Sequence, residues 1–157
     1  MSSNATSDET GIVVAGIGYD GRFYVLADAS GRYTPDAWAS RVVQAYRDHR
    51  ADRIIAERNQ GGALVEATLR TVDRNVPITT IHAREGKRLR AEPVAALYEQ
   101  GRVSHVGALS ILEDQMTAWD PAAGGRSPDR VDALVYALAE LAGPTRDRTV
   151  TEEDYDF

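Results

Sequence analysis

The sequence contains no cysteine among its 157 residues. Disulfide scaffolds, cysteine-ligated zinc sites and thiol catalysis are therefore excluded. No apolar run approaches the roughly 20 residues that cross a membrane. The opening stretch MSSNATSDETG is polar and has no apolar segment of the kind found in secretory signals. We therefore expect a cytoplasmic protein that makes no use of a membrane.

An excess of positive charge is also missing. The formal net charge is −6, which argues against a general nucleic-acid binder, because such proteins usually carry a basic excess. The charge is unevenly distributed, however. The final TEEDYDF is acidic, whereas HAREGKRLRAEP gathers Arg84, Lys87, Arg88 and Arg90. A local basic patch can therefore exist in an acidic protein.

A phosphate-binding loop of the ATPase type is absent as well. The tetrapeptide REGK has the glycine and lysine of that motif, but Ile81 stands where its earlier glycine belongs. Arg88 replaces the serine or threonine that follows the lysine. The chain therefore contains no ATPase motif.

Length and composition fit one globular domain, with 43% hydrophobic and 27% charged residues. We expect a flexible N-terminus over residues 1–10, a folded domain over 11–143 and a flexible acidic tail over 144–157. Residue patterns predict strands and helices in alternation after an initial hairpin, whose turn is Asp20-Gly21. The expected strands span 11–18, 22–30, 51–57, 76–83 and 102–107, and the expected helices span 34–50, 61–75, 88–101, 110–119 and 128–141. This order predicts an α/β domain with a mixed sheet flanked by helices.

Three acidic residues are candidates for chemistry. Glu57 stands in RIIAERNQGG, where an apolar strand runs into a polar turn, and ligand sites in open α/β sheets gather outside the carboxyl ends of strands. Asp129 and Asp132 have helical i, i+3 spacing at the start of the last helix, so both carboxylates lie on one face. Oxygen clusters of this type hold Mg²⁺ or Mn²⁺. Two such ions about 4 Å apart can activate water and stabilise a leaving oxygen.

Each of these residues also has a purely structural interpretation. Asp129 alone is better explained by the helix macrodipole, which favours a carboxylate in the first turn. Asp132 is surrounded by apolar residues, so a buried carboxylate there would need a partner. Glu57 could form an ion pair with Arg53 or Arg58. Spacing alone leaves the metal site and the structural interpretation equally supported.

Two further positions are weaker candidates. His82 and His105 lie on separate expected strands with no spacing that links them, so core or edge histidines are the better interpretation. Asp28 ends an expected strand, where it could face the same sheet edge as Glu57 or begin a turn with Ser30.

Five segments in order, over about residues 8–142, together resemble a known family. They are DETGIVVAGIGYDGRFYVLADAS, ADRIIAERNQGGALV, AREGKRLRAEPVAALYEQGRVSHVG, LEDQMTAW and SPDRVDALVYAL. They are similar to the nuclease domain of the large terminase subunit of tailed bacteriophages. The resemblance implies an RNase H/resolvase-like fold and an endonuclease that cleaves concatemeric double-stranded DNA during genome packaging with Mg²⁺ or Mn²⁺, as two ions.

The resemblance also implies roles for particular residues. Glu57 matches the family's E-x-N-x-G-G position and would be one acidic metal ligand. Asp129 and Asp132 match D-R-V-D-A and would supply the last one, with Asp132 the more inward of the two. Lys87, Arg88 and Arg90 would lie near the DNA backbone, because such contacts need charge and no base sequence.

The chain departs from the family pattern at its start. Family members have a strand ending in Asp-Pro just before the stretch matched by SSNATSDETG, and that aspartate is the first metal ligand. Here Met1 follows that point, so the resemblance predicts a fold without the first strand and without the upstream ATPase domain. Two alternatives follow: a catalytically incomplete module that binds DNA or assists assembly, and a resolvase-like junction endonuclease. In a full-length protein the resemblance implies an ATPase domain, the small terminase subunit and the portal as partners, in the host cytoplasm.

Overall fold

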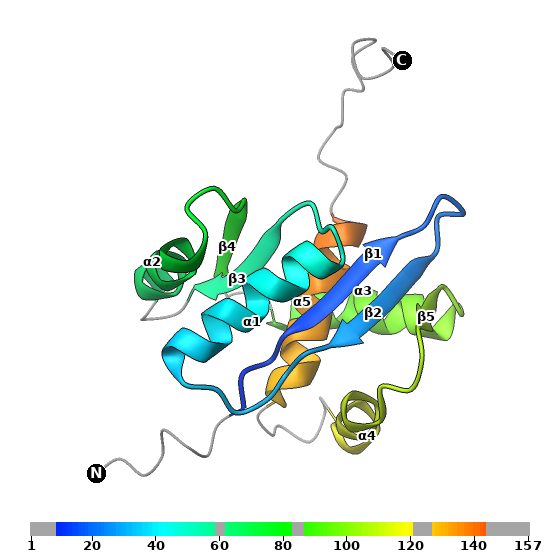
Figure 1. The fold of residues 1–157 in the computed structure, drawn as a ribbon. Coiled ribbons are helices and arrows are strands. Elements are labelled where there is room, and N and C mark those ends of the chain that lie inside the picture. Colours follow the sequence, from blue (N-terminus) through cyan, green and yellow to red (C-terminus); the bar gives the residue numbers. More distant parts are fainter. Residues whose placement is uncertain (1–8, 59–61, 83–86, 121–126, 144–157) are drawn as a thin grey trace, which may run out of the picture.

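A computed structural model of the chain describes residues 9–58, 62–82, 87–120 and 127–143. Strands and helices alternate after an initial hairpin, which confirms the α/β organisation expected from the sequence (Figure 1). The elements are β1 (Val13–Ile17), β2 (Phe23–Asp28), α1 (Pro35–Asp48), β3 (Ile54–Arg58), α2 (Gly62–Val72), β4 (Ile78–His82), α3 (Lys87–Glu99), β5 (Val103–His105), α4 (Ser110–Ala118) and α5 (Asp129–Ala142). The predicted acidic tail and residues 1–8 lie outside the described residues.

Local sequence explains how several of these elements begin and turn. The hairpin between β1 and β2 turns at Gly21, whose φ of 76° is favourable for glycine and costly for other residues. Pro35 opens α1, where its missing N–H costs no helical hydrogen bond. The Thr34 hydroxyl caps the same helix by accepting a hydrogen bond from the Ala37 N–H at 3.4 Å.

The strands form two sheets. In the three-stranded sheet, β2 lies between β1, which is antiparallel to it, and β5, which is parallel to it. This is the mixed sheet that the sequence predicted. The second sheet consists of β3 and β4 in parallel. Within the described part of the chain, β1 pairs only with β2 and β3 pairs only with β4, so each of them has an edge without a strand partner.

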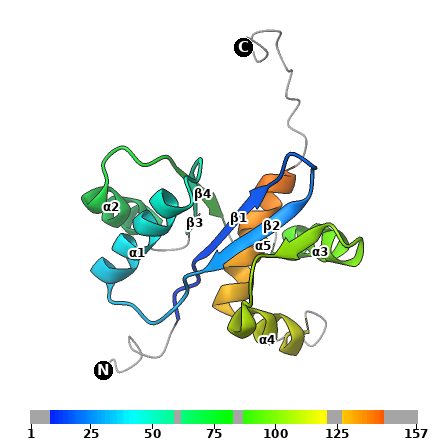
Figure 2. The same cartoon turned by 45° about the vertical axis from the view of Figure 1, so that its right-hand side comes forward.

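Helix α5 joins the two sheets because it contacts β1 and β2 as well as β3. Figure 2 shows α1 and α2 beside β3 and β4, with α3 and α4 on the opposite side of the molecule and α5 running behind β1 and β2. The larger hydrophobic core lies under the three-stranded sheet and includes Val25, Leu112, Leu134 and Leu138. A separate, smaller core joins α1 and α2, and its fully buried members among the described residues are Ala39, Val43 and Leu69.

Gly11 allows the chain before β1 to approach the first turn of α5. A Cβ atom at this position would lie 2.2 Å from the Asp129 carbonyl oxygen and 3.1 Å from the Ala133 Cβ. Because the nearer of these atoms belongs to backbone, only glycine fits without a shift of the helix. The N-terminal end of α5, which carries two of the predicted site residues, is thus fixed against the strand that follows Gly11.

Candidate functional site

Glu57 is the next-to-last residue of β3, as expected from the apolar run before it. Ala56 is buried, whereas Glu57 is partly exposed and Arg58 is exposed. In the parallel ladder Glu57 stands beside Ile81 of β4. The turn that should follow, residues 59–61, lies outside the described residues. The position of Glu57 near a strand's carboxyl end agrees with the sequence-based expectation.

Asp129 and Asp132 both lie in the first turn of α5. The helix has Pro128 at its cap position and no side-chain cap hydrogen bond. Asp132 accepts a hydrogen bond from the Ser127 hydroxyl, so the carboxylate has the kind of polar partner that partial burial requires. Both aspartates are partly exposed.

Tyr136 is a buried side chain of α5 on which the charges of both Glu57 and Asp132 act. It follows Asp132 by one helical turn on α5 and is only 7% exposed. Burial raises the pKa of the Tyr136 hydroxyl above its ordinary value, and the negative charges of Glu57 and Asp132 raise it further. Carboxylates from β3 and from α5 therefore act on one buried phenol.

Arg90 of α3 belongs to the same group. Its guanidinium carbon lies 5.9 Å from the centre of the Tyr136 ring, a distance at which a cation is attracted by an aromatic face. The positive charge of Arg90 also acts against the two carboxylates on the pKa of Tyr136. Of the three predicted DNA contacts, Arg90 is the one whose side chain the structure describes. The backbone of Lys87 and Arg88 forms the start of α3, and their side chains lie outside the described residues.

The Tyr136 hydroxyl is buried and has no hydrogen-bond partner within the described residues. A buried hydroxyl in that state costs about 1–3 kcal/mol. Sequence reasoning missed this residue, although its i+4 spacing from Asp132 was visible. A tyrosine in an apolar helix is normally interpreted as a core residue, and the ring of Tyr136 is indeed buried in the core.

The carboxylates of Glu57 and Asp132 are the kind of ligand that a hard divalent cation prefers. Mg²⁺ is often held by one or two carboxylates together with several waters, and Glu57 and Asp132 are two carboxylates of that kind. Among the residues that the structure describes, no group of three or more histidine, cysteine or acidic side chains is placed to hold a metal ion. Two carboxylates are donors that Mg²⁺ or Mn²⁺ accepts when water completes the coordination.

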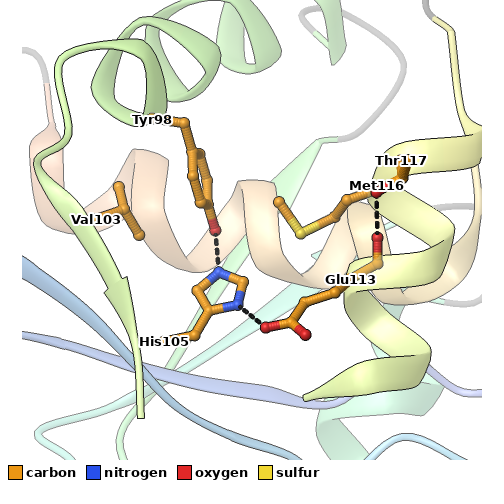
Figure 3. A pocket seen from close by; sticks show the side chains of 6 residues that line it. All are labelled: Tyr98, Val103, His105, Glu113, Met116 and Thr117. Carbon is orange, nitrogen blue, oxygen red and sulfur yellow. Dashed lines mark hydrogen bonds and ion pairs between the residues drawn. The ribbon is translucent and has the colours of Figure 1, made fainter. Parts of the chain in front are cut away.

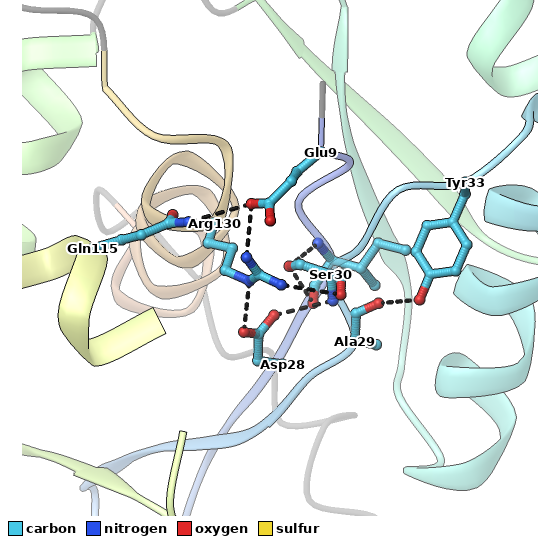
Figure 4. A network of polar contacts seen from close by, with 8 residues as sticks. Glu9, Asp28, Ala29, Ser30, Tyr33, Gln115 and Arg130 are labelled. Carbon is cyan, nitrogen blue, oxygen red and sulfur yellow. Dashed lines mark hydrogen bonds and ion pairs between the residues drawn. The ribbon is translucent and has the colours of Figure 1, made fainter. Parts of the chain in front are cut away.

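A second residue that sequence reasoning missed is Arg130, which is 5% exposed. Figure 4 shows its guanidinium between the carboxylates of Glu9 and Asp28, at 2.7 and 3.0 Å. It also donates to the Ser30 carbonyl at 3.3 Å, and Gln115 of α4 donates to Glu9 at 3.2 Å. Asp28 in addition accepts the Ser30 N–H at 3.0 Å, which confirms the turn interpretation of Asp28. This network fixes the start of α5 to the chain before β1.

His105 takes part in a separate polar chain on the outer strand β5. Figure 3 shows its Nε2 atom 2.7 Å from the Tyr98 hydroxyl and its Nδ1 atom 3.1 Å from Glu113. These residues line an open pocket of about 330 Å³ together with Val103, Met116 and Thr117. None of the predicted site residues lines this pocket. His105 is therefore an edge histidine with structural partners, as the sequence suggested, and the side chain of His82 lies outside the described residues.

Comparison with known proteins gave one match. The model of a family described as a terminase RNaseH-like domain matches residues 1–141. No curated protein and no solved structure matches the chain. In the described part of the chain, no helix has the length and apolar character needed to span a membrane.

Proposed function

Because the chain belongs to the family of terminase RNaseH-like domains, we propose that it is the metal-dependent endonuclease domain of a phage DNA-packaging terminase. Its substrate would be concatemeric double-stranded DNA. The observation that carries the proposal is that β3 and α5 lie side by side, with Arg53, just before β3, paired to Glu140 of α5 at 3.2 Å, and that the charges of Glu57 and Asp132 both act on the buried Tyr136. Two carboxylates delivered by different elements to one place are typical of a site for a hard cation.

Glu57 and Asp132 would hold Mg²⁺ or Mn²⁺, as one ion or a pair, and Asp129 is the remaining acidic candidate in the first turn of α5. When bound, such ions activate water and neutralise the charge that develops on a phosphodiester. The carboxylates of the chain would position the ions. The hydrogen bond from Ser127 to Asp132 supports one orientation of that carboxylate.

The basic residues of α3 would bind the DNA backbone. Arg90 lies against Tyr136, so its charge is beside the carboxylate pair, where a phosphate would have to approach. Lys87 and Arg88 precede it in the same helix. Contacts of this kind are independent of base sequence and weaken steeply with added salt. In the packaging machine, the further partners would be an ATPase domain, the small terminase subunit and the portal, and the setting would be the host cytoplasm.

A plasmid-nicking assay with Mn²⁺ tests this function. We expect wild-type protein to relax supercoiled DNA and expect Glu57→Gln and Asp132→Asn each to reduce cleavage to background. Asp36→Asn is the matched control, because Asp36 also lies in the first turn of a helix but in α1. Glu92→Gln on the exposed face of α3 is the second control. Cleavage by both site variants at the wild-type rate would contradict the proposal.

A second function has one observation in its favour. Within the described residues no cluster of three potential metal-binding side chains occurs, which suits a module that binds DNA or assists assembly without cutting. Such a module would leave plasmid intact at every Mn²⁺ concentration. It would still bind duplex DNA in a salt-dependent way and lose affinity on Arg90→Gln.

A further inference from the structure

Tyr136 is the buried polar group of α5 that the described structure leaves without a hydrogen bond. Asp132, one helical turn earlier in α5, accepts a hydrogen bond from Ser127. The other strongly buried polar side chain of the helix, Arg130, makes hydrogen bonds to Glu9, Asp28 and Ser30. The Tyr136 oxygen, by contrast, is inaccessible to solvent and has no partner in the part of the chain described here. Since buried polar groups in native proteins are nearly always hydrogen-bonded, this hydroxyl can take a partner that the described residues do not provide.

The surroundings of Tyr136 restrict what that partner can be. Glu57 and Asp132 act electrostatically on the phenol, yet neither accepts a hydrogen bond from it. A tyrosine hydroxyl ordinarily keeps its proton at neutral pH. A neutral hydroxyl can donate one hydrogen bond and accept others. The partner must therefore be compatible with a hydroxyl and with two negative charges at once.

A water molecule bound to a divalent cation meets these requirements. The cation offsets the two carboxylates, and its coordinated water can hydrogen-bond to the phenol oxygen. Mg²⁺ and Mn²⁺ sites with few protein ligands retain such waters. A monovalent anion such as chloride would be repelled by Glu57 and Asp132.

We propose that the Tyr136 hydroxyl is a positioning group of the cation site, which holds a water bound to a Mg²⁺ or Mn²⁺ ion between Glu57 and Asp132. The proposal rests on the function proposed above and assigns a new residue to that site. Arg90 packs against the face of the Tyr136 ring and so limits the directions in which the phenol can point. Tyr136 then acts on the reaction through the water that it orients, without contacting the DNA itself.

The test is Tyr136→Phe, which keeps the ring in the core and removes only the hydroxyl. Because that hydroxyl has no partner in the described part of the chain, its loss should leave the thermal midpoint in EDTA unchanged or higher. Mn²⁺ affinity, measured from the electron paramagnetic resonance signal of free Mn²⁺, should fall about tenfold, as is typical when a group that supports a metal ligand is removed.

Tyr98→Phe is the matched control. It makes the same chemical change at a hydroxyl that lies 2.7 Å from the Nε2 atom of His105. We expect this variant to have a lower thermal midpoint in EDTA and the wild-type affinity for Mn²⁺. The two variants should therefore show opposite patterns of stability and metal binding.

The outcomes separate this inference from the proposed function. If wild-type protein binds no Mn²⁺ and cuts no DNA, the proposed function fails, and the role of Tyr136 fails with it. If wild-type protein binds Mn²⁺ and Tyr136→Phe binds it equally well, only the role of Tyr136 is refuted. A fall in the EDTA midpoint of Tyr136→Phe at unchanged Mn²⁺ affinity would refute it too, since the hydroxyl would then have a structural partner.

Discussion

Replacing Arg130 by methionine should destabilise the protein severely. The side chain of Arg130 is 6% exposed and lies between Glu9 and Asp28. Methionine fills a similar length but leaves both carboxylates without their cation. Glu9 is 31% exposed and can be hydrated, whereas Asp28 is 9% exposed and cannot. Removing one partner of a buried ion pair lowers the free energy of unfolding by about 3–5 kcal/mol. Because Glu9 can be hydrated, we expect a loss near the lower end of this range.

Urea unfolding followed by circular dichroism measures this loss. The matched control is Arg53→Met, which removes an arginine that pairs with Glu140 at 3.2 Å but is 52% exposed. An exposed pair is worth at most about 1 kcal/mol. Adding Asp28→Asn to Arg130→Met should recover part of the stability, because the stranded buried charge is removed. A loss below about 1 kcal/mol for Arg130→Met would refute the reasoning, since the network would then contribute no more than a surface pair.

Two more predictions concern backbone approach and alkaline stability. Gly11→Ala should lower the unfolding free energy by about 1–3 kcal/mol, because the new Cβ would overlap the Asp129 carbonyl. The control is Gly16→Ala, whose Cβ would have its nearest contact at an ordinary 3.8 Å. It should change the unfolding free energy by less than about 0.5 kcal/mol. Burial, with a smaller effect from Glu113, raises the pKa of Tyr98 above its ordinary 10.0. The unfolded phenol therefore loses its proton first, and stability should fall as pH rises above 10.0. In urea titrations at several pH values, Tyr98→Phe should make the unfolding free energy fall less steeply with pH. An unchanged dependence on pH would refute the explanation that a buried, neutral Tyr98 causes the fall.

Much of the fold was accessible from sequence because it depends on local chemistry. The Asp20-Gly21 turn, the Thr34-Pro35 start of α1 and the apolar run before Glu57 each specify structure within a few residues. The division of the strands into two sheets was not predicted. Which strands pair depends on contacts between distant segments, and a strand's own composition does not record them.

The positions of the candidate residues were predictable in part. The sequence placed Glu57 near the end of a strand and Asp132 in the first turn of the last helix, as the structure has them, whereas their role in a metal site stays a prediction. Arg130 was missed because an arginine in a first helical turn normally points to solvent. Its carboxylate partners lie 102 and 121 residues away in the sequence, so no local pattern could reveal that it is buried.

The separation into two sheets with α5 between them has a consequence for local unfolding. Glu57 belongs to the part of the protein built on the small core of Ala39, Val43 and Leu69, whereas Asp132 belongs to the larger core. Regions with few buried apolar contacts open at lower free energy than the rest of a domain. The amides of β3 and β4 should therefore exchange their hydrogens sooner than those of β1 and β2. A ligand that binds Glu57 and Asp132 together would stabilise the folded arrangement of β3 against α5 and slow that exchange, so amide protection of β3 would report on binding at the proposed site.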